Sequence, residues 1–425
     1  MSLSDRLSEI RGGFQPAFWV ANFTELFERL AYYGLQAVLA IYLHEKLGFT
    51  DAQTGSIQGI FGFVVWFLPI IAGALADRFG FRRALSFAYL VLSLGYFLIG
   101  QVGADWMAPL RNAVPMFWLM LLVLMVPALG PGLVKPVVAG TTARASTEAM
   151  RGVGYSIYYT IVNVGGALGP LLASTVRTRL GVESVFIMSA LFAAAMFVVS
   201  VLFFREPPRP PDEQVRTVGA ALGNMVLVLK NIRFMLFLLL FSGFYVVFWQ
   251  VYVALPLYVR GSIGPDVPID ALTSIEGFGV IAFTVVVAWA TRKVPALKAI
   301  AAGVLITALS WLLLLVSGSN LFIGLTLVGV AIGEVTLAPR FYEYCSRLAP
   351  KGQEGLFLGY AFLPVAIGYL IGGPLGGNLV HHYAANGHPA HVWVVVAIIG
   401  VATSASLFLY DRVLGPQSRE EPAAA

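Results

Sequence analysis

Long apolar segments recur along the whole 425-residue chain, and they constrain its fold more than any other feature. A helix that crosses a bilayer needs about 20 consecutive, mostly apolar residues. The sequence contains twelve such segments, and hydrophobic residues make up 58% of the chain against 12% for charged residues. A soluble protein of this length could not hide so much apolar surface from water. We therefore predict an all-α membrane protein with twelve transmembrane helices.

The predicted spans lie at residues 16–43, 52–75, 83–102, 114–139, 152–175, 184–204, 232–259, 272–291, 296–316, 321–343, 354–380 and 390–411. Residues 1–15 are polar and the first apolar run already has the length of a span, so we expect no cleavable signal peptide. With a cytoplasmic N-terminus, 20 of the 27 Lys and Arg residues fall in cytoplasmic segments and 5 in outside loops. Basic residues favour the cytoplasmic side. We expect an integral protein of the plasma (inner) membrane with both termini in the cytoplasm.

A stretch rich in proline and charge, residues 205–216, separates the sixth predicted span from the seventh. Such a composition is typical of a linker. The sequence therefore predicts an N-terminal six-helix bundle at residues 1–204, a cytoplasmic linker at 205–231 and a C-terminal six-helix bundle at 232–425.

An internal repeat supports this division. The fourth span contains the run Gly130-Pro-Gly-Leu-Val-Lys135-Pro136, and the tenth contains a similar run, Gly333-Glu334-Val-Thr-Leu-Ala-Pro339. The final prolines of the two runs are 203 residues apart. Gly152 and Gly355, which begin the fifth and eleventh spans, have the same separation. Repeats at a fixed offset indicate two copies of one structural unit, so the two bundles are predicted to be pseudo-symmetric.

The loop after the second span contains Gly73-Ala-Leu-Ala-Asp77-Arg78-Phe-Gly80-Phe-Arg82-Arg83. Together with two six-span halves in parallel repeat, this run resembles the signature of the major facilitator superfamily. The two glycines suit close packing and a tight turn, and the aspartate suits a cap or a pair across the interface between the halves. The arginines are expected to hold the cytoplasmic gate. An ordinary basic loop is the alternative interpretation.

Three charged residues, Glu25, Glu28 and Arg29, interrupt the first span. A charge at mid-bilayer is costly and by default indicates function. With Tyr32 and Tyr33, these residues follow helical i, i+3, i+4, i+7 and i+8 spacing and share one face. That face is expected to line a polar cavity or to pair with another span.

The fourth span contains Lys135, which we expect to pair with the acids of the first span. A nearby ammonium favours the ionised form of a carboxyl, whereas desolvation disfavours it. The balance between these two effects on the carboxyl changes when the site opens to one side of the membrane, so a buried carboxyl can bind and release a proton. A structural ion pair that clamps the two spans together is the alternative.

These residues resemble the motifs of the proton-dependent oligopeptide transporter (POT/PTR) family. Glu25-Leu-Phe-Glu28-Arg29-Leu-Ala-Tyr32-Tyr33-Gly34 is similar to its span-1 motif Glu-x-x-Glu-Arg-Phe-x-Tyr-Tyr-Gly and differs only at Leu30. Lys135-Pro136 resembles its span-4 motif, and Tyr158-Tyr159-Thr-Ile-Val-Asn163-Val-Gly165 resembles its span-5 motif. Glu334, followed by Pro339, resembles its span-10 motif. The similarities fall in four spans, in both halves and in the family's order.

The resemblance implies a proton symporter. In the family, the span-1 charges and the span-4 lysine couple proton movement to the substrate, and here these residues are Glu25, Glu28, Arg29 and Lys135. The resemblance also implies a substrate pocket lined by Tyr32, Tyr33, Lys135, Tyr159, Asn163 and Glu334. Glu334 would meet the amino group of a peptide and Lys135 would supply the opposite polarity, because a zwitterion needs an anion at one end and a cation at the other.

The chain departs from the family pattern at its outer gate. Gln36 stands where the family places an arginine, and the seventh span lacks the acid that pairs with that arginine. Losing both members together leaves no unpaired buried charge, so the gate is expected to close through other contacts. The linker also has no room for the two extra spans of many bacterial members.

Further candidates lie in both halves. We predict that Gln36 and Trp249 contact substrate, with ordinary packing as the alternative for the tryptophan. Glu276 begins the eighth span, where the family more often has an amide; it is predicted to be a proton site or a substrate contact, the alternative being a helix-end acid at the membrane interface. His381, His382, His388 and His391 are more typical of a solvated loop than of a metal site, so no metal is expected.

The sequence therefore predicts a proton-coupled secondary transporter that imports di/tripeptides or peptide-like zwitterions by alternating access. The same fold carrying another small organic solute or drug, including as an exporter, is the main alternative. A non-transporting sensor or an intramembrane enzyme would need a soluble domain or a catalytic pair, and no Walker loop, dinucleotide fingerprint or nucleophile triad is present. We expect a monomer in the bilayer with a small-molecule substrate, without enzyme activity, nucleic acid or any cofactor besides the coupling proton.

Overall fold

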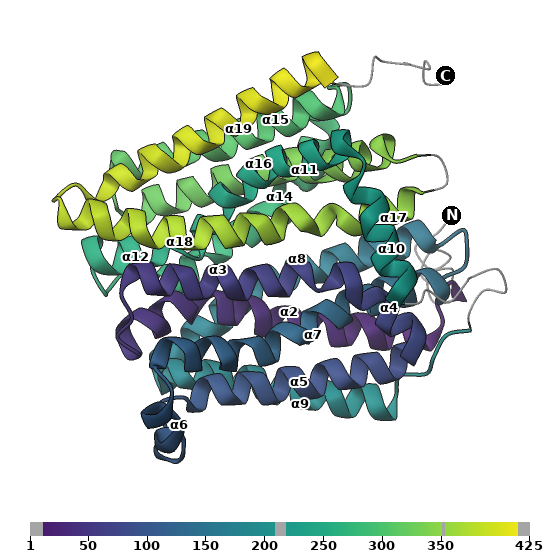
Figure 1. Cartoon of the computed structure of the whole chain (residues 1–425), viewed down its shortest axis with the longest axis horizontal. Coiled ribbons are helices and arrows are strands. Elements are labelled where there is room, and N and C mark those ends of the chain that lie inside the picture. The colour runs from purple at the N-terminus through teal and green to yellow at the C-terminus, as the bar shows by residue number, and fades with distance from the viewer. Residues whose placement is uncertain (1–11, 209–217, 351–352, 415–425) are drawn as a thin grey trace, which may run out of the picture.

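The computed structural model describes residues 12–208, 218–350 and 353–414. The predicted cytoplasmic tails and residues 209–217 of the predicted linker lie outside the described residues. Long helices run back and forth along one direction and lie side by side (Figure 1). We call residues 12–208 the N-terminal half, residues 218–414 the C-terminal half, and the surface between them the seam.

The N-terminal half consists of helices joined by short turns. Its elements are α2 (Pro16–Ile41), η1 (Tyr42–Lys46), α3 (Asp51–Phe67), α4 (Pro69–Phe79), α5 (Phe81–Gln101), η2 (Asp105–Met107), α6 (Ala108–Ala113), α7 (Met116–Arg144), α8 (Arg151–Leu180) and α9 (Val182–Leu202).

The C-terminal half is built in the same way. Its elements are α10 (Val218–Leu229), α11 (Ile232–Phe248), η3 (Trp249–Val251), α12 (Ala254–Tyr258), η4 (Val259–Ile263), α13 (Ile269–Leu272), α14 (Ser274–Thr291), α15 (Ala296–Ser310), η5 (Trp311–Leu315), α16 (Asn320–Leu348), α17 (Glu354–Gly359), η6 (Tyr360–Phe362), α18 (Leu363–Ala385), η7 (Pro389–His391) and α19 (Val392–Leu414).

Eleven helical segments of the described residues are long and apolar enough to cross a membrane. The remaining span, α2, has 26 residues but carries Glu25, Glu28 and Arg29 in its middle. The prediction of an all-α fold with twelve spans is confirmed. Within the described ranges, two helices lie outside the predicted spans: the short α6 between the third and fourth spans, and α10, which lies within the predicted linker at 205–231 and contacts α4 and α11.

Local sequence explains several helix ends. The Thr50 hydroxyl accepts a hydrogen bond from the backbone of Gln53, whose side chain accepts one from the backbone of Thr50, so this capping box starts α3. Gly80 and Gly181 have φ values of +88° and +90°. This left-handed backbone suits glycine, and it lets the chain reverse between α4 and α5 and between α8 and α9.

The apolar core separates into two large clusters, each made mainly by one half, and a small third cluster in the C-terminal half. Tyr89 and Phe186 belong to the cluster of the N-terminal half. Phe241 and Trp311 belong to the cluster of the C-terminal half, where the Trp311 and Trp393 rings stack with centroids 4.7 Å apart. Each half therefore has a core of its own, and the seam is free to carry polar groups.

The halves pack most closely where glycines of one meet the other. A Cβ atom on Gly55 of α3 would lie 2.2 Å from the carbonyl oxygen of Gly373 on α18. A Cβ atom on Gly277 of α14 would lie 2.7 Å from the backbone nitrogen of Ala167 on α8. Both sites lie toward the end of the bundle that carries η1, η4 and α13, which we call the far end. The first and last described helices begin and end at the opposite, terminal end (Figure 1).

Candidate functional site

The charged residues of α2 form one buried cluster. Glu25, Glu28 and Arg29 are at most 3% exposed. The Nε atom of Arg29 lies 3.2 Å from Glu25 Oε1, and its Nη2 pairs with Glu28 Oε2. The predicted shared face agrees with these contacts. Two carboxylates around one guanidinium leave one negative charge in excess, so the cluster needs a further cation or a proton.

The prediction that Lys135 forms an ion pair with these acids is wrong. Within the described residues no carboxylate oxygen lies within the 4.0 Å limit of an ion pair from its Nζ, which instead lies 3.7 Å from the centre of the Trp66 ring. Arg29 lies on the same helix as the two acids, and its guanidinium already pairs with both of them. Lys135 still interacts with both acids electrostatically. A cation–π contact holds an ammonium without neutralising it, so the charge of Lys135 stays available to an anion.

Aromatic and amide groups from both halves meet beside this lysine. The Tyr32 hydroxyl accepts hydrogen bonds from Trp66 Nε1 at 3.1 Å and from Gln36 Nε2 at 2.9 Å. Gln36 Nε2 also donates to the Tyr369 hydroxyl of α18 at 2.6 Å. The Tyr369 ring stacks on Trp249, with centroids 4.0 Å apart. We call these five residues the seam cluster, because they join the two halves through neutral groups.

Neutral amides occupy the spans where the family pattern has a charged gate pair. Gln36 bonds across the seam to Tyr369, as described above. Gln250, a buried residue of the seventh span, donates to the carbonyl oxygens of Val246 at 2.7 Å and Gly372 at 3.0 Å, both within the C-terminal half. The hydrogen bonds of these amides stabilise buried positions without a charge.

Two carboxyl groups face each other in the C-terminal half. Glu276 of α14 and Glu334 of α16 lie within side-chain hydrogen-bonding range. Glu276 lies in the first turn of α14 and is only 7% exposed. One oxygen of the half-buried Glu334 is buried without a hydrogen-bond donor among the described residues. Two carboxylates in contact cannot both stay ionised in a low dielectric, so this carboxyl pair requires a proton or a cation.

The carboxyl pair faces the N-terminal half. Both acids interact electrostatically with Tyr33 of α2 and Tyr159 of α8. Tyr33 is half-buried and meets Tyr32 edge to face, with centroids 5.3 Å apart. Tyr159 is 43% exposed. The Nδ2 atom of Asn163 donates to the carbonyl oxygen of Tyr159 at 2.9 Å on the same helix. The structure therefore brings the tyrosines near the carboxyl pair and leaves Asn163 bound to its own backbone.

The loop between α4 and α5 makes its described contacts within the N-terminal half. Asp77 Oδ1 lies 3.2 Å from Arg144 Nη2 of α7, so this pair does not cross the seam as expected. Gly80 makes the predicted tight turn. A Cβ atom on Gly73 would meet Pro136 at 3.6 Å, an ordinary contact, so the packing at this position leaves room for a small side chain.

The arginines of this loop also contact their own half. Arg82 donates to the carbonyl oxygen of Val201 on α9. Arg78 lies over the ring of its neighbour Phe79 at 5.7 Å, and Arg83 is exposed. Glu206, which was not predicted as a site residue, accepts hydrogen bonds from the backbone N–H groups of residues 81 and 82. An acid at this position stabilises the start of α5.

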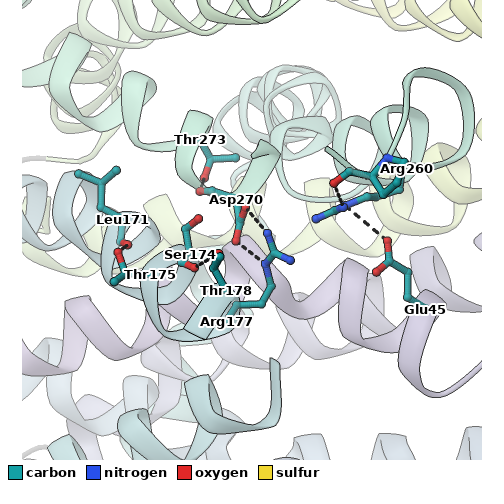
Figure 2. A network of polar contacts seen from close by, with 10 residues as sticks. Glu45, Leu171, Ser174, Thr175, Arg177, Thr178, Arg260, Asp270 and Thr273 are labelled. Atoms are coloured by element: carbon teal, nitrogen blue, oxygen red, sulfur yellow. Dashed lines mark hydrogen bonds and ion pairs between the residues drawn. The ribbon is translucent and has the colours of Figure 1, made fainter. Parts of the chain in front are cut away.

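Two ion pairs that were not predicted cross the seam at the far end, Arg177 with Asp270 and Arg260 with Glu45 (Figure 2). The arginines were counted only as basic residues of outside loops. The available signal was the presence of both charge signs at the predicted span ends of both halves. No group of three His, Cys, Asp or Glu side chains in the described parts of the chain could hold a metal ion.

Twelve spans in two halves, with titratable and aromatic side chains at the seam between them, define an integral membrane protein of the transporter class. Residues 22–271 match the sequence profile of the family described as Major Facilitator Superfamily. The chain belongs to this superfamily, whose members are membrane transporters.

Relatives of known sequence and structure agree with this assignment. The chain is 23% identical over 398 residues to "Multidrug resistance protein MdtH" of Salmonella newport (strain SL254), covering 93% of this chain and 94% of the relative. It is 30% identical over 175 residues to "Uncharacterized transporter YclF" of Bacillus subtilis (strain 168), covering 39% of this chain and 33% of the relative.

Solved structures of POT family transporters share the fold. A peptide transporter POT in complex with sulfate has a TM-score of 0.75 at 20% identity and covers 94% of this chain and 95% of its own. A POT family transporter in complex with 5-aminolevulinic acid has a TM-score of 0.74 at 19% identity, covering 93% and 96%. The POT family transporter PepTSo has a TM-score of 0.77 at 17% identity, covering 95% and 99%.

Proposed function

We propose that this transporter is a proton symporter that imports di- or tripeptides, or related zwitterions, by alternating access between its two halves. The observation that carries the proposal is the charge polarity across the seam. Among the described residues, Lys135 in the N-terminal half has no carboxylate within ion-pair distance, and Glu276 and Glu334 in the C-terminal half interact with each other and have no cation within ion-pair distance. A solute with a carboxylate at one end and an ammonium at the other satisfies both sites at once.

In this proposal the substrate lies between the halves. Its carboxylate binds Lys135 and its ammonium binds the carboxyl pair. Tyr32, Tyr33 and Trp66 supply aromatic surface near the cation, and Tyr159 supplies it near the acids. A structural relative is described in complex with 5-aminolevulinic acid, which has an amino and a carboxyl group, and this supports the choice of a zwitterion.

The α2 cluster is proposed to couple the proton through charge balance. When all groups are ionised, the charges of Glu25, Glu28, Arg29 and Lys135 cancel. A proton on one acid leaves the other acid paired with Arg29, and the group then carries one positive charge. The carboxylate of a substrate at Lys135 offsets that charge. Proton and substrate therefore bind best together, because each removes an uncompensated charge that the other would leave.

A second candidate function is transport of a cationic or other organic solute, including its export. The relatives named "Multidrug resistance protein MdtH" favour it, and so do the neutral amides Gln36 and Gln250 at the seam. A lone cation would bind the carboxyl pair and displace its proton, without using Lys135.

The proposal is tested with purified protein in liposomes that carry an imposed pH gradient. Labelled dialanine should accumulate only with the gradient present, and unlabelled dipeptides should compete with it. Glu334→Gln should abolish this uptake. Glu343→Gln is the matched control, since Glu343 lies on the same helix but pairs with Arg340 and Arg347 at its terminal end. Absence of dipeptide uptake together with gradient-driven movement of an organic cation would establish the second candidate instead.

We further propose that the protein works as a monomer in the plasma (inner) membrane, with the terminal end of the bundle facing the cytoplasm. Residues 1–204 and 232–425 are proposed to be the two bundles that move against each other. The excess of Lys and Arg in segments at the terminal end supports this orientation. Protease digestion of C-terminally tagged protein in right-side-out vesicles tests it. The tag should be cleaved only after the membrane is permeabilised.

A further inference from the structure

Two ion pairs bridge the seam at the far end (Figure 2). Arg177, near the end of α8, contacts Asp270 of α13 through two bonds, Nε to Oδ2 at 2.6 Å and Nη2 to Oδ1 at 3.1 Å. Arg260 of η4 contacts Glu45 of η1, with Nε 3.4 Å from Oε1. A two-bond arginine–carboxylate contact fixes both the distance and the orientation of its partners.

The two pairs are reciprocal. In the first, the N-terminal half supplies the cation and the C-terminal half the anion; in the second, the roles are reversed. Each half therefore contributes one cation and one anion to the two pairs. Separation of the halves would leave four unpaired charges at once, two on each half.

Three of the four charged groups are shielded from water more than those of ordinary surface pairs. Asp270 is fully buried, the side chain of Arg260 is 6% exposed, and that of Arg177 is 21% exposed. Glu45 is the most accessible member, at 44%. A cavity of about 280 Å³ is lined by Glu45 and Arg177, one member of each pair. Solvent can therefore reach the charges when the pairs break, which keeps the cost of opening moderate.

We propose that these two pairs form a reciprocal lock that holds the far end closed, in place of the charged gate pair that the sequence lacks. The lock acts together with the glycine contacts of α3 with α18 and of α8 with α14 at the same end. It must open and close once in each cycle of alternating access, so this inference rests on the proposed mode of transport but not on the proposed substrate.

The lock is tested by the accessibility of a cysteine at the far end, measured without substrate or gradient. The single native cysteine, Cys345, is fully buried. Ser174 is 8% exposed and lies one turn before Arg177, beside the first pair (Figure 2). Ser174→Cys therefore gives a nearly isosteric reporter, and the rate of its reaction with a membrane-impermeant maleimide measures opening of the far end.

Asp270→Asn and Glu45→Gln, each combined with the reporter, should raise the labelling rate at least threefold. The exchange Arg177→Asp with Asp270→Arg should return the rate toward that of the reporter alone, because it restores the pair with its polarity reversed. Glu183→Gln is the matched control. It removes the 2.7 Å pair with Lys46 at the same end, but both members of that pair belong to the N-terminal half.

Unchanged labelling in both Asp270→Asn and Glu45→Gln would overturn the lock, and so would an equal increase in Glu183→Gln. If Asp270→Asn fails to fold because Arg177 loses its buried partner, Glu45→Gln decides alone, since its side chain is partly solvated. A protein that shows these labelling changes but transports no dipeptide would retain the lock while losing the proposed substrate.

Discussion

Replacing Lys135 by methionine should remove recognition of the substrate carboxylate. The Nζ atom contacts the Trp66 ring at 3.7 Å and no carboxylate within 4.0 Å among the described residues. The direct contact that the folded protein loses is therefore a cation–π interaction of about 0.5–2 kcal/mol. A hydrogen bond from a charged group to a ligand contributes about 1.5–3 kcal/mol. At about 1.4 kcal/mol per factor of ten, this corresponds to a roughly 10- to 150-fold loss of affinity.

The loss should depend on the ligand. Calorimetric titration in detergent would compare dialanine with dialanine amide, which lacks the carboxylate, in wild type and Lys135→Met. Wild type should prefer dialanine by roughly 10- to 150-fold, and the variant should bind both ligands about as weakly as wild type binds the amide. If Lys135→Met weakens both ligands equally, or keeps the preference for dialanine, the role assigned to Lys135 is refuted.

Two further predictions concern coupling and packing. Glu28→Gln should lower gradient-driven accumulation of substrate at least tenfold. Exchange of labelled for unlabelled substrate should continue, because Arg29 keeps its contact with Glu25 at 3.2 Å. Loss of exchange as well would contradict the assignment of the proton site. Gly95→Ala should cost about 1–3 kcal/mol of stability and lower the melting temperature in detergent, since its Cβ would lie 2.4 Å from Pro127 Cδ. Gly103→Ala, with no atom within 4 Å of the added Cβ, is the control and should melt like wild type.

The spans could be predicted because each is a long apolar run whose limits are set by local residues. The predicted segment 83–102, for example, corresponds to α5 at Phe81–Gln101. The helix α10 was missed for a physical reason. Its 12 residues are apolar but too short to cross a bilayer, and they follow a polar, proline-rich stretch, so neither length nor composition indicates a helix there.

The candidate site also has contacts that could be predicted from the sequence and contacts that could not. The contact of Glu25 with Arg29 follows from i, i+4 spacing within one helix, which a sequence displays directly. Lys135 lies over Trp66 because of the rotation of α7 against α3, and no spacing within one helix encodes that rotation. The pairing of Arg177 with Asp270 depends on the register of one half against the other. Contacts between elements are therefore the part of the site that the sequence left open.

The first of the twelve spans, α2, is also the one least suited to lipid. On translocon insertion scales, an ionised residue at the centre of a lone helix costs about 2.5–3.5 kcal/mol, and α2 carries three. The helices that α2 packs against most extensively in the folded protein, α7, α8 and α9, follow it in the chain. Stable residence of α2 in the bilayer thus has to wait until translation has passed Leu202 at the end of α9, so insertion of α2 depends on helices that are made after it.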